Sequence, residues 1–233
     1  MSNFNKLYQT IIEDEIFKAS TPEEGIRRKE QYAKIMIQEL VDAKKITRNQ
    51  DGTYDAEGDV DLSDLGLTKL PVRFNKVGEG FFCADNHLTT LEGSPRSVGG
   101  SFWCAHNQLT TLEGSPLSVG GGFWCYDNQL TTLEGSPQSV GGGFGCSSNQ
   151  LTTLKGSPRS VDGSFGCHSN QLTTLEGSPR SVGGDFWCHD NQLTTLEGSP
   201  RSVGGRFWCS NNKKKFTKEE VRDVCDVKGK IYV

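Results

Sequence analysis

The sequence predicts an α+β repeat solenoid. Its parallel β-sheet should have about eight 21-residue rungs, between a helical N-terminal cap and a short helix and strand at the C-terminal end. A 21-residue period runs from about Val60 to Asn212, and seven cysteines keep it without error. Self-similarity at such a period is typical of stacked repeats. Only 33% of the 233 residues are hydrophobic while 28 are glycine, which favours a thin core served by many turns.

The number of rungs in the solenoid follows from the positions of the cysteines. Leu62 occupies the same column one step before the first cysteine, with Val60 in the neighbouring phenylalanine column, so the first of the eight rungs is degenerate. The seven cysteines are Cys83, Cys104, Cys125, Cys146, Cys167, Cys188 and Cys209.

Alternation within each copy assigns its residues to two faces. The copy that begins at Phe102 reads F-W-C-A-H-N-Q-L-T-T-L-E-G-S-P-L-S-V-G-G-G. Successive side chains of a strand point to opposite faces, so Phe102 and Cys104 should point inward and Trp103 outward. The return segment E-G-S-P-x-S-V-G-G has no helical period and favours extended and turn conformations. We therefore expect one continuous parallel sheet, with strands centred near Trp103, Trp124, Gly145, Gly166, Trp187 and Trp208.

The spacing inside the copy resembles that of the leucine-rich repeat family. Phe102, Cys104, Asn107, Leu109 and Leu112 fall on the pattern L-x-L-x-x-N-x-L-x-x-L, with Phe and Cys in the first two leucine places. The resemblance covers about two thirds of the chain and implies an asparagine ladder that turns the backbone after each strand. The ladder would consist of Asn86, Asn107, Asn128, Asn149, Asn170 and Asn191. An asparagine amide can satisfy backbone groups inside a tight bend, in agreement with this role.

Residues 1–58 should form an N-terminal helical cap with a small hairpin. Thr21-Pro22-Glu23-Glu24 has the pattern of a capping box and predicts a helix to about Ala43. A shorter helix is expected over Asn3–Phe17, and Asp51-Gly52 predicts a hairpin turn between Ile46 and Tyr54. The apolar surface of the longer helix would come from Ile26, Tyr32, Ile35, Ile37, Leu40 and Val41.

Residues 59–212 should form the solenoid, and residues 213–233 its C-terminal cap. Lys214 and Thr217 occupy the two leucine columns, so the stack should stop there. Thr217-Lys218-Glu219-Glu220 is a second capping-box pattern and predicts a short helix through Val224. Residues 231–233 could add a closing strand.

Two groups of proteins carry similar repeats. Short repeats behind N-terminal helices resemble the leucine-rich effectors that some bacterial pathogens inject into host cells. The ubiquitin-ligase activity of some of them requires a Cys-x-Asp motif, whereas here Asp226 directly follows Cys225, so the resemblance implies no such activity. The text N-Q-L-T-T-L-E-G-S-P-R-S-V-G-G-D-F-W-C, from Asn170 to Cys188, more closely resembles repeats in uncharacterised proteins of tailed bacteriophages. This second resemblance implies a phage origin but supplies no activity.

Catalytic, metal and cofactor chemistry find little support in the sequence. The cysteines have no C-x-x-C pair to hold zinc and are best interpreted as core thiols. His168 and His189 fall on adjacent rungs and could take a metal or work as an acid–base pair, but no third ligand column accompanies them. We therefore predict that the protein is not an enzyme and binds no metal or cofactor.

Charge and hydropathy restrict the partners and the compartment. The net charge of −4 does not favour nucleic acid, and the lysines at positions 213–215 form only a local basic spot. No stretch approaches the roughly 18 apolar residues of a membrane span, and no export signal precedes the helices. A cytoplasmic protein with reduced thiols is expected. On the return side we expect mutually compensating columns of glutamate and arginine, namely Glu92, Glu113, Glu134, Glu176 and Glu197 with Arg96, Arg159, Arg180 and Arg201.

The outward residues of the sheet form the candidate binding site. Trp103 and Trp124 on one side and Trp187 and Trp208 on the other flank two consecutive glycines in the same column. The glycines should leave a notch of bare backbone two rungs wide, although the tryptophans could also simply stack to stiffen the sheet. The site would comprise Trp103, Trp124, Tyr126, Gly145, Gly166, His168, Asp185, Trp187, His189, Arg206 and Trp208.

These observations support two hypotheses about function. The first is a binding module, most simply a phage accessory protein that binds a protein of the bacterial host and inhibits or redirects it, with defence proteins among the candidates. The second is a structural or assembly component of a virion or scaffold, because solenoid ends and edge strands are natural stacking surfaces. The sequence leaves the oligomeric state open.

Overall fold

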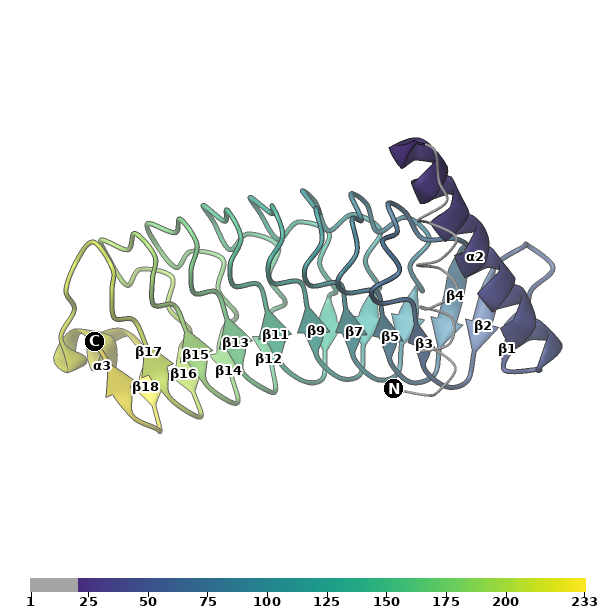
Figure 1. Cartoon of the computed structure of the whole chain (residues 1–233). Helices are drawn as coiled ribbons and strands as arrows, with labels where there is room; N and C mark the ends of the chain where they lie inside the picture. Colours follow the sequence, from purple (N-terminus) through teal and green to yellow (C-terminus); the bar gives the residue numbers. More distant parts are fainter. Residues whose placement is uncertain (1–20) are drawn as a thin grey trace.

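The computed structural model describes residues 21–233, so the helix expected over Asn3–Phe17 lies outside the described residues. The chain winds into an elongated coil of stacked rungs, with helix α2 across one end and helix α3 beside the other (Figure 1). The two caps and the solenoid therefore follow one another along the chain in the predicted order.

Helix α2, Pro22–Asp42, begins where its capping residues predict. The Thr21 side chain accepts a hydrogen bond from the Glu24 amide, and Pro22 occupies the first turn, where its missing N–H costs nothing. Ala33, Met36 and Ile37 are buried against the first rungs.

Two residues assigned to the apolar face of α2 are exposed instead. Ile35 lies two residues from Ala33, which turns its side chain to the far side of a helix with 3.6 residues per turn. Ile26 lies near the N-terminal end of α2, which projects past the solenoid in Figure 1. Met36, which the sequence analysis did not assign to that face, takes a place in the core.

The predicted hairpin is confirmed. Strands β1, Ile46–Arg48, and β2, Tyr54–Ala56, pair antiparallel, with Ile46 opposite Ala56. Gly52 adopts a φ of 83°, which glycine reaches without steric cost, in the turn between them. Strand β2 then pairs in parallel with β4, Phe74–Val77, and joins the cap to the solenoid.

The main sheet has nine parallel strands in unbroken order, with β3 and β19 at its ends. We call it the strand sheet. It comprises β3 (Val60–Asp61), β5 (Phe81–Phe82), β7 (Phe102–Trp103), β9 (Phe123–Trp124), β11 (Phe144–Gly145), β13 (Phe165–Gly166), β15 (Phe186–Trp187), β17 (Phe207–Trp208) and β19 (Ile231–Tyr232). The closing strand at residues 231–233 is thus confirmed, and it adds a ninth strand to the eight rungs.

The predicted register of the strand sheet is also confirmed. The seven repeat phenylalanines and the repeat cysteines are buried, and each phenylalanine pairs in register with the next. Neighbouring phenylalanine rings lie 5.1 to 5.8 Å apart between centroids, so one aromatic stack runs through the core. All eight cysteines are free, and burial raises the pKa of the solenoid thiols well above its usual range.

A second parallel sheet, not expected from the sequence, forms on the return side. Its strands are the Ser-Val pairs of the return segment, and we call it the return sheet. It comes in two parts, with a break between β10 and β12. The first part adds β6 (Ser97–Val98), β8 (Ser118–Val119) and β10 (Ser139–Val140) to β1, β2 and β4; the second holds β12 (Ser160–Val161), β14 (Ser181–Val182), β16 (Ser202–Val203) and β18 (Asp226–Val227).

The asparagine ladder implied by the repeat pattern is present on each rung from Asn86 onward, whereas the first rung has Leu65 in that column. The Asn107 amide nitrogen donates to the carbonyls of Cys83, Cys104 and Ala105 at 3.0 to 3.2 Å, and its oxygen accepts from the Leu88 amide at 2.9 Å. These bonds join two rungs and satisfy backbone groups that the turn would otherwise leave buried and unpaired. Asn212 makes the same contacts on the last rung, one step beyond the predicted ladder.

The C-terminal cap is built as predicted. Helix α3, Lys218–Val224, begins with a complete capping box between Thr217 and Glu220. Phe216 and Val221 are buried and cover the end of the core where the leucine columns stop.

Candidate functional site

The outward side chains of the strand sheet form a face that we call the strand face. Three columns cross it: the residue after each cysteine, the residue before it, and the residue before each phenylalanine. The tryptophans of the middle column are partly exposed, and Trp208 is exposed, as the register requires. Ala105 also belongs to this face, yet it is fully buried.

Aromatic residues gather in two clusters on the strand face. The first cluster consists of Trp103, Trp124, Tyr126 and His106. The indoles of Trp103 and Trp124 lie 5.5 Å apart, and the Tyr126 ring meets Trp103 edge to face at 6.3 Å and His106 at 5.1 Å. Burial and the nearby Asp85 and Asp127 raise the pKa of Tyr126.

Trp124 lies down along the sheet because its neighbours are glycines. A Cβ atom placed on Gly122, Gly143 or Gly145 would fall 2.6 to 2.8 Å from the indole of Trp124. Side chains at these positions would therefore lift the ring off the sheet. The glycines let Trp124 present a flat aromatic surface to solvent, where a partner's apolar or cationic group could stack.

The second cluster joins two histidines to the next aromatic residues. It consists of His168, His189, Trp187, Trp208 and Tyr232. The two imidazoles stack at 4.5 Å with planes 7° apart, and His189 stacks on Trp208 at 4.2 Å. Trp208 in turn packs against Tyr232 of β19 at 5.6 Å, so the closing strand extends the cluster beyond the repeats.

Partial burial lowers the pKa of both histidines. Desolvation lowers the pKa of His168, the nearby His189 lowers it further, and Asp190 and Asp127 oppose the shift. Desolvation also lowers the pKa of His189, against Asp190. The Nδ1 atoms of both rings are buried without a hydrogen-bond partner in the described part of the chain. Neutral imidazoles therefore behave here as aromatic surface.

The predicted notch of bare backbone is absent, and this corrects the sequence analysis. Gly145 and Gly166 are buried because rings from both clusters lean over them. A Cβ atom on Gly145 would meet Trp124 at 2.7 Å, and one on Gly166 would meet Trp187 at 3.3 Å and His168 at 3.7 Å. The two glycines therefore widen the aromatic surface instead of interrupting it with a hollow.

Asp185 and Arg206 occupy the column before the phenylalanines, on adjacent rungs. The guanidinium of Arg206 donates to one oxygen of Asp185 at 2.7 and 2.9 Å, and its backbone amide donates to the other at 2.6 Å. These bonds lower the pKa of Asp185. The pair borders the second cluster, because Arg206 lies beside Tyr232, and each charge is compensated by the other.

Metal chemistry has no cluster to support it in the described residues. Within residues 21–233, no three His, Cys, Asp or Glu side chains come together in a way that could hold a metal ion. His168 and His189 are stacked face to face, with their neighbours contributing rings in place of ligands.

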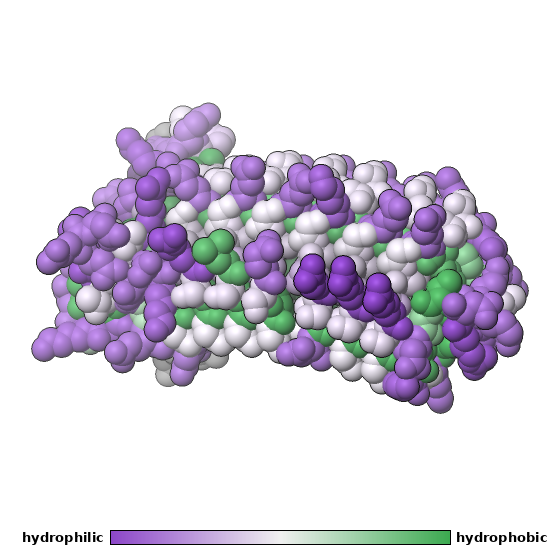
Figure 2. Space-filling model, turned by 180° about the vertical axis from the view of Figure 1, so that it is seen from behind, coloured by the Kyte–Doolittle hydropathy of each residue, from purple (hydrophilic) through white to green (hydrophobic). Residues whose placement is uncertain are grey.

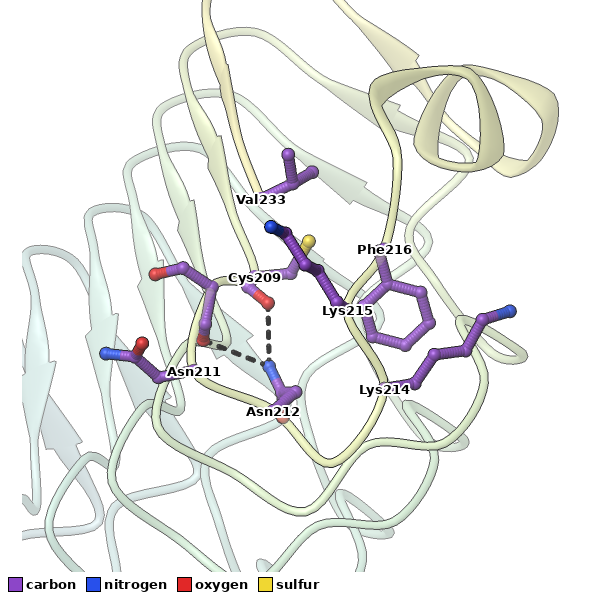
Figure 3. Close-up of a pocket in the computed structure, with 8 residues that line it drawn as sticks. Cys209, Asn211, Asn212, Lys214, Lys215, Phe216 and Val233 are labelled. Atoms are coloured by element: carbon purple, nitrogen blue, oxygen red, sulfur yellow. Dashed lines mark hydrogen bonds between the residues drawn. The ribbon is translucent and has the colours of Figure 1, made fainter.

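A cavity of about 250 Å³ opens at the C-terminal end of the solenoid (Figure 3). The sequence analysis did not anticipate it, because its wall combines the last rung with the cap. Asn212 lines it and donates to the carbonyls of Cys209 and Ser210, at 2.8 and 3.3 Å. The predicted basic spot contributes Lys214 and Lys215 to the rim, and Phe216 and Val233 line the same cavity.

Comparison with solved structures finds a similar fold in a leucine-rich-repeat domain. The leucine-rich-repeat domain of a Shigella effector superposes with a TM-score of 0.57 at 15% sequence identity, and the alignment covers 99% of this chain and 98% of that domain. YopM, a leucine-rich effector of Yersinia pestis, gives a TM-score of 0.46 at 16% identity and covers 91% of this chain and 66% of its own. A scan against protein-family models finds no match, and a comparison with curated proteins finds no relative. The chain is thus similar in fold to the Shigella domain, a leucine-rich-repeat-like parallel solenoid.

Proposed function

We propose that the protein is a macromolecule-binding solenoid whose strand face docks a protein partner. The observation that carries this proposal is the pair of aromatic clusters on one flat sheet. Tryptophan, tyrosine and arginine dominate the binding energy of protein interfaces. Rings held in place by stacking also lose little conformational freedom when a partner covers them. Trp124 and Trp208 would anchor the two ends of the interface.

Binding is favoured over catalysis by the surroundings of the titratable groups. His168 and His189 have lowered pKa values, as catalytic histidines can have. Their rings, however, are stacked against each other, and His189 also stacks on Trp208. This arrangement uses both faces of His189 for packing, so the cluster supports a contact surface.

The biological role that we propose is that of a phage accessory protein. The repeat from Asn170 to Cys188 resembles repeats of tailed-phage proteins, and such a protein would act in the cytoplasm of the bacterial host. It would bind a host protein, with defence proteins among the candidates, and inhibit or redirect it. No helix in residues 21–233 has the length and apolar character needed to cross a membrane.

The test is capture of a partner from bacterial lysate with matched variants. Trp124→Ala and Trp208→Ala should each weaken capture of a specific protein by about tenfold or more, as expected for hot-spot aromatics. Leu117→Ala is the control, because Leu117 is 62% exposed on the return side. A protein retained equally by all variants, or no protein retained by any, would contradict binding through the strand face.

A structural or assembly role is the second candidate. Strand β1 is the end strand of the return sheet, and Thr47 and Arg48 on it are exposed. An edge strand can pair with a second copy. Light scattering over a wide concentration range checks this: growth of the mass with concentration supports assembly, and a constant monomer mass rejects it.

A further inference from the structure

Three arginines form an uninterrupted column on the second part of the return sheet. Arg159, Arg180 and Arg201 are exposed, and their backbones are hydrogen bonded rung to rung, each at 2.8 Å. Arginine is the most hydrophilic residue on the scale of Figure 2, which shows a row of adjacent, strongly hydrophilic side chains projecting from this side. We call this column the arginine ladder.

The arginine ladder lacks the compensation that the sequence analysis expected. Elsewhere on the return side, Lys155 pairs with Glu134 at 2.7 Å, and Arg73 pairs with Glu92. Within residues 21–233, no ion pair joins Arg159, Arg180 or Arg201 to a carboxylate. Like charges on neighbouring strands destabilise a sheet. The same column holds neutral Leu117 and Gln138 on earlier rungs, so the repeat does not need a charge there.

We propose that the arginine ladder docks the acidic stripe of an α-helix belonging to a protein partner. Rungs of a parallel sheet repeat every ~4.8 Å, so the three guanidinium groups emerge at heights of about 0, 4.8 and 9.6 Å. A helix rises ~1.5 Å per residue, so carboxylates at i, i+3 and i+7 lie at about 0, 4.5 and 10.5 Å along its axis. A helix parallel to the solenoid axis therefore meets the ladder in register, one carboxylate for each arginine.

The negative charges near the arginine ladder favour a partner with a narrow acidic stripe over a continuous polyanion such as a nucleic acid. Glu176 and Glu197 lie four residues before Arg180 and Arg201 in the sequence, and Asp162 lies three residues after Arg159. All three are exposed. A nucleic-acid backbone would bring phosphates near these carboxylates, whereas a helix offers one row of acids and can place neutral or basic residues on either side. Planar guanidinium groups also match carboxylates by two parallel hydrogen bonds.

The experiment measures binding of fluorescent peptides to the full-length protein at low ionic strength. The probe is an alanine-rich helical peptide with glutamates at i, i+3 and i+7. Its matched control has the same composition with the glutamates at i, i+2 and i+5, which spreads them around the helix. A single-stranded oligonucleotide of equal charge is the third ligand. We expect the first peptide to bind at least about fivefold more tightly than either of the others.

Substitutions in the protein test whether the peptide binds at the arginine ladder. The triple variant Arg159→Gln, Arg180→Gln, Arg201→Gln should lose about tenfold in affinity for the first peptide, a loss that 0.15 M salt should partly reproduce. Arg96→Gln, in the same column but isolated, should change nothing. A variant with both Trp124→Ala and Trp208→Ala should bind the peptide normally, which separates this site from the strand face. Equal binding of both peptides, tighter binding of the oligonucleotide, an unaffected triple variant, or no binding at peptide concentrations on the order of 1 mM would each overturn the proposal.

Discussion

The strand sheet and the return sheet are built from the same repeats, yet only the strand sheet is continuous. Its nine strands follow in order from β3 to β19, whereas the return sheet is divided between β10 and β12. On the strand side, one column holds Trp124 on one rung and Gly145 and Gly166 on the next two, and the strands still pair in register. On the return side, one departure from the repeat coincides with the break. The two sheets therefore differ in how much substitution they tolerate.

The cause lies in the glycine that follows the valine of each return strand. The amide of this glycine donates a hydrogen bond to the carbonyl of the valine in the preceding rung, as Gly120 does to Val98 at 2.9 Å. A Cβ atom on these glycines would fall 2.0 to 2.3 Å from a carbonyl oxygen of the preceding rung, far inside any allowed contact. From Gly78 to Gly204 the column has one exception, Asp162, and we infer that its Cβ keeps β10 and β12 from pairing.

The end of the return sheet supports this explanation. Lys228 occupies the same column directly after β18, and its amide still donates to the Val203 carbonyl at 3.0 Å. Strand β18 is the last of its sheet and is held from one side, so it can shift to accommodate a side chain. An interior rung is held from both sides and has no such freedom. Outward side chains of the strand face, by contrast, point into solvent and meet only other side chains.

Removing an aromatic ring from the core should cause the largest loss of stability, and it should destabilise both sheets because they share that core. Phe144 is fully buried in the middle of the phenylalanine stack, between Phe123 and Phe165. Phe144→Ala should lower the free energy of unfolding by about 3–5 kcal/mol. Denaturant unfolding followed by circular dichroism measures it. A loss below about 1 kcal/mol would mean that the stack is not a shared core, since even one buried methylene is worth about that much.

An added methyl group should destabilise the return sheet more than the strand sheet. Gly120→Ala places a Cβ 2.1 Å from the carbonyl oxygen of Gly99 and should cost about 1–3 kcal/mol, the usual range for overpacking. Gly166→Ala is the matched change on the strand face, where the nearest atom belongs to the Trp187 side chain at 3.3 Å. It should cost about 0.5 kcal/mol or less. Equal losses in the two variants would contradict the proposed difference between the sheets.

The repeat makes most of this fold predictable from sequence, and it also explains what was missed. Strict alternation around Phe102 and Cys104 determines the register of the strand sheet, and the capping residues Thr21 and Thr217 determine where both helices start. The return sheet escaped prediction because its Ser-Val strands sit among turn-forming proline and glycine residues, with no alternating apolar pattern to mark them. Each is stable only because identical neighbours lie above and below it, which is a property of the stack and not of one copy.

The candidate site was predictable in its residues but not in its shape. Alternation places Trp124, Trp187 and His168 on one face, as observed. Whether a ring stands upright or lies over a neighbour depends on packing between rungs, so the sequence suggested a notch where the structure has covered glycines. The uncompensated arginine ladder was missed for a similar reason, because column spacing alone does not tell which side chains reach one another.

The strand face, unlike the return face, should respond to mild acid through its two stacked histidines. Folding lowers the pKa of His168 and His189 below the ordinary value of about 6.5, mainly by desolvation. Above pH 6.5 both rings are neutral in either state, so stability is full. As pH falls below 6.5 the unfolded chain takes up protons first, and stability should decline until the lower folded pKa values are passed.

Measurement of the denaturation midpoint from pH 7.5 to 4.5 tests this decline. A variant with both His168→Asn and His189→Asn should lose less stability over the same range than the unchanged protein. The difference should be smaller than the effect of Gly120→Ala, because both rings keep some contact with water. Identical pH profiles for the two proteins would show that the stacked pair does not titrate differently on folding.

Joining β10 to β12 should have the smallest effect on stability, and it should change hydrogen exchange only near residue 162. Asp162→Gly removes the Cβ that separates β10 from β12 and should allow the amide of residue 162 to bond to the carbonyl of Val140. The new bond contributes about 0.5–1.5 kcal/mol, and the added glycine flexibility costs about 0.5–1 kcal/mol. The net change in unfolding free energy should therefore be close to zero, while hydrogen exchange at residue 162 slows.

Asp162→Ala distinguishes steric from electrostatic causes of the break. Alanine removes the carboxylate but keeps the Cβ, so the amide of residue 162 should exchange as fast as it does in the unchanged protein. If the Ala and Gly variants slow exchange equally, the charge of Asp162 divides the return sheet, and the carbonyl contact does not. If neither slows it, the division originates elsewhere in the rung, for example at Gln138 and Arg159, which precede β10 and β12 at equivalent positions on the two sides of the break. Slow exchange in the Gly variant alone would establish that a single Cβ atom divides a sheet that the repeat otherwise makes continuous.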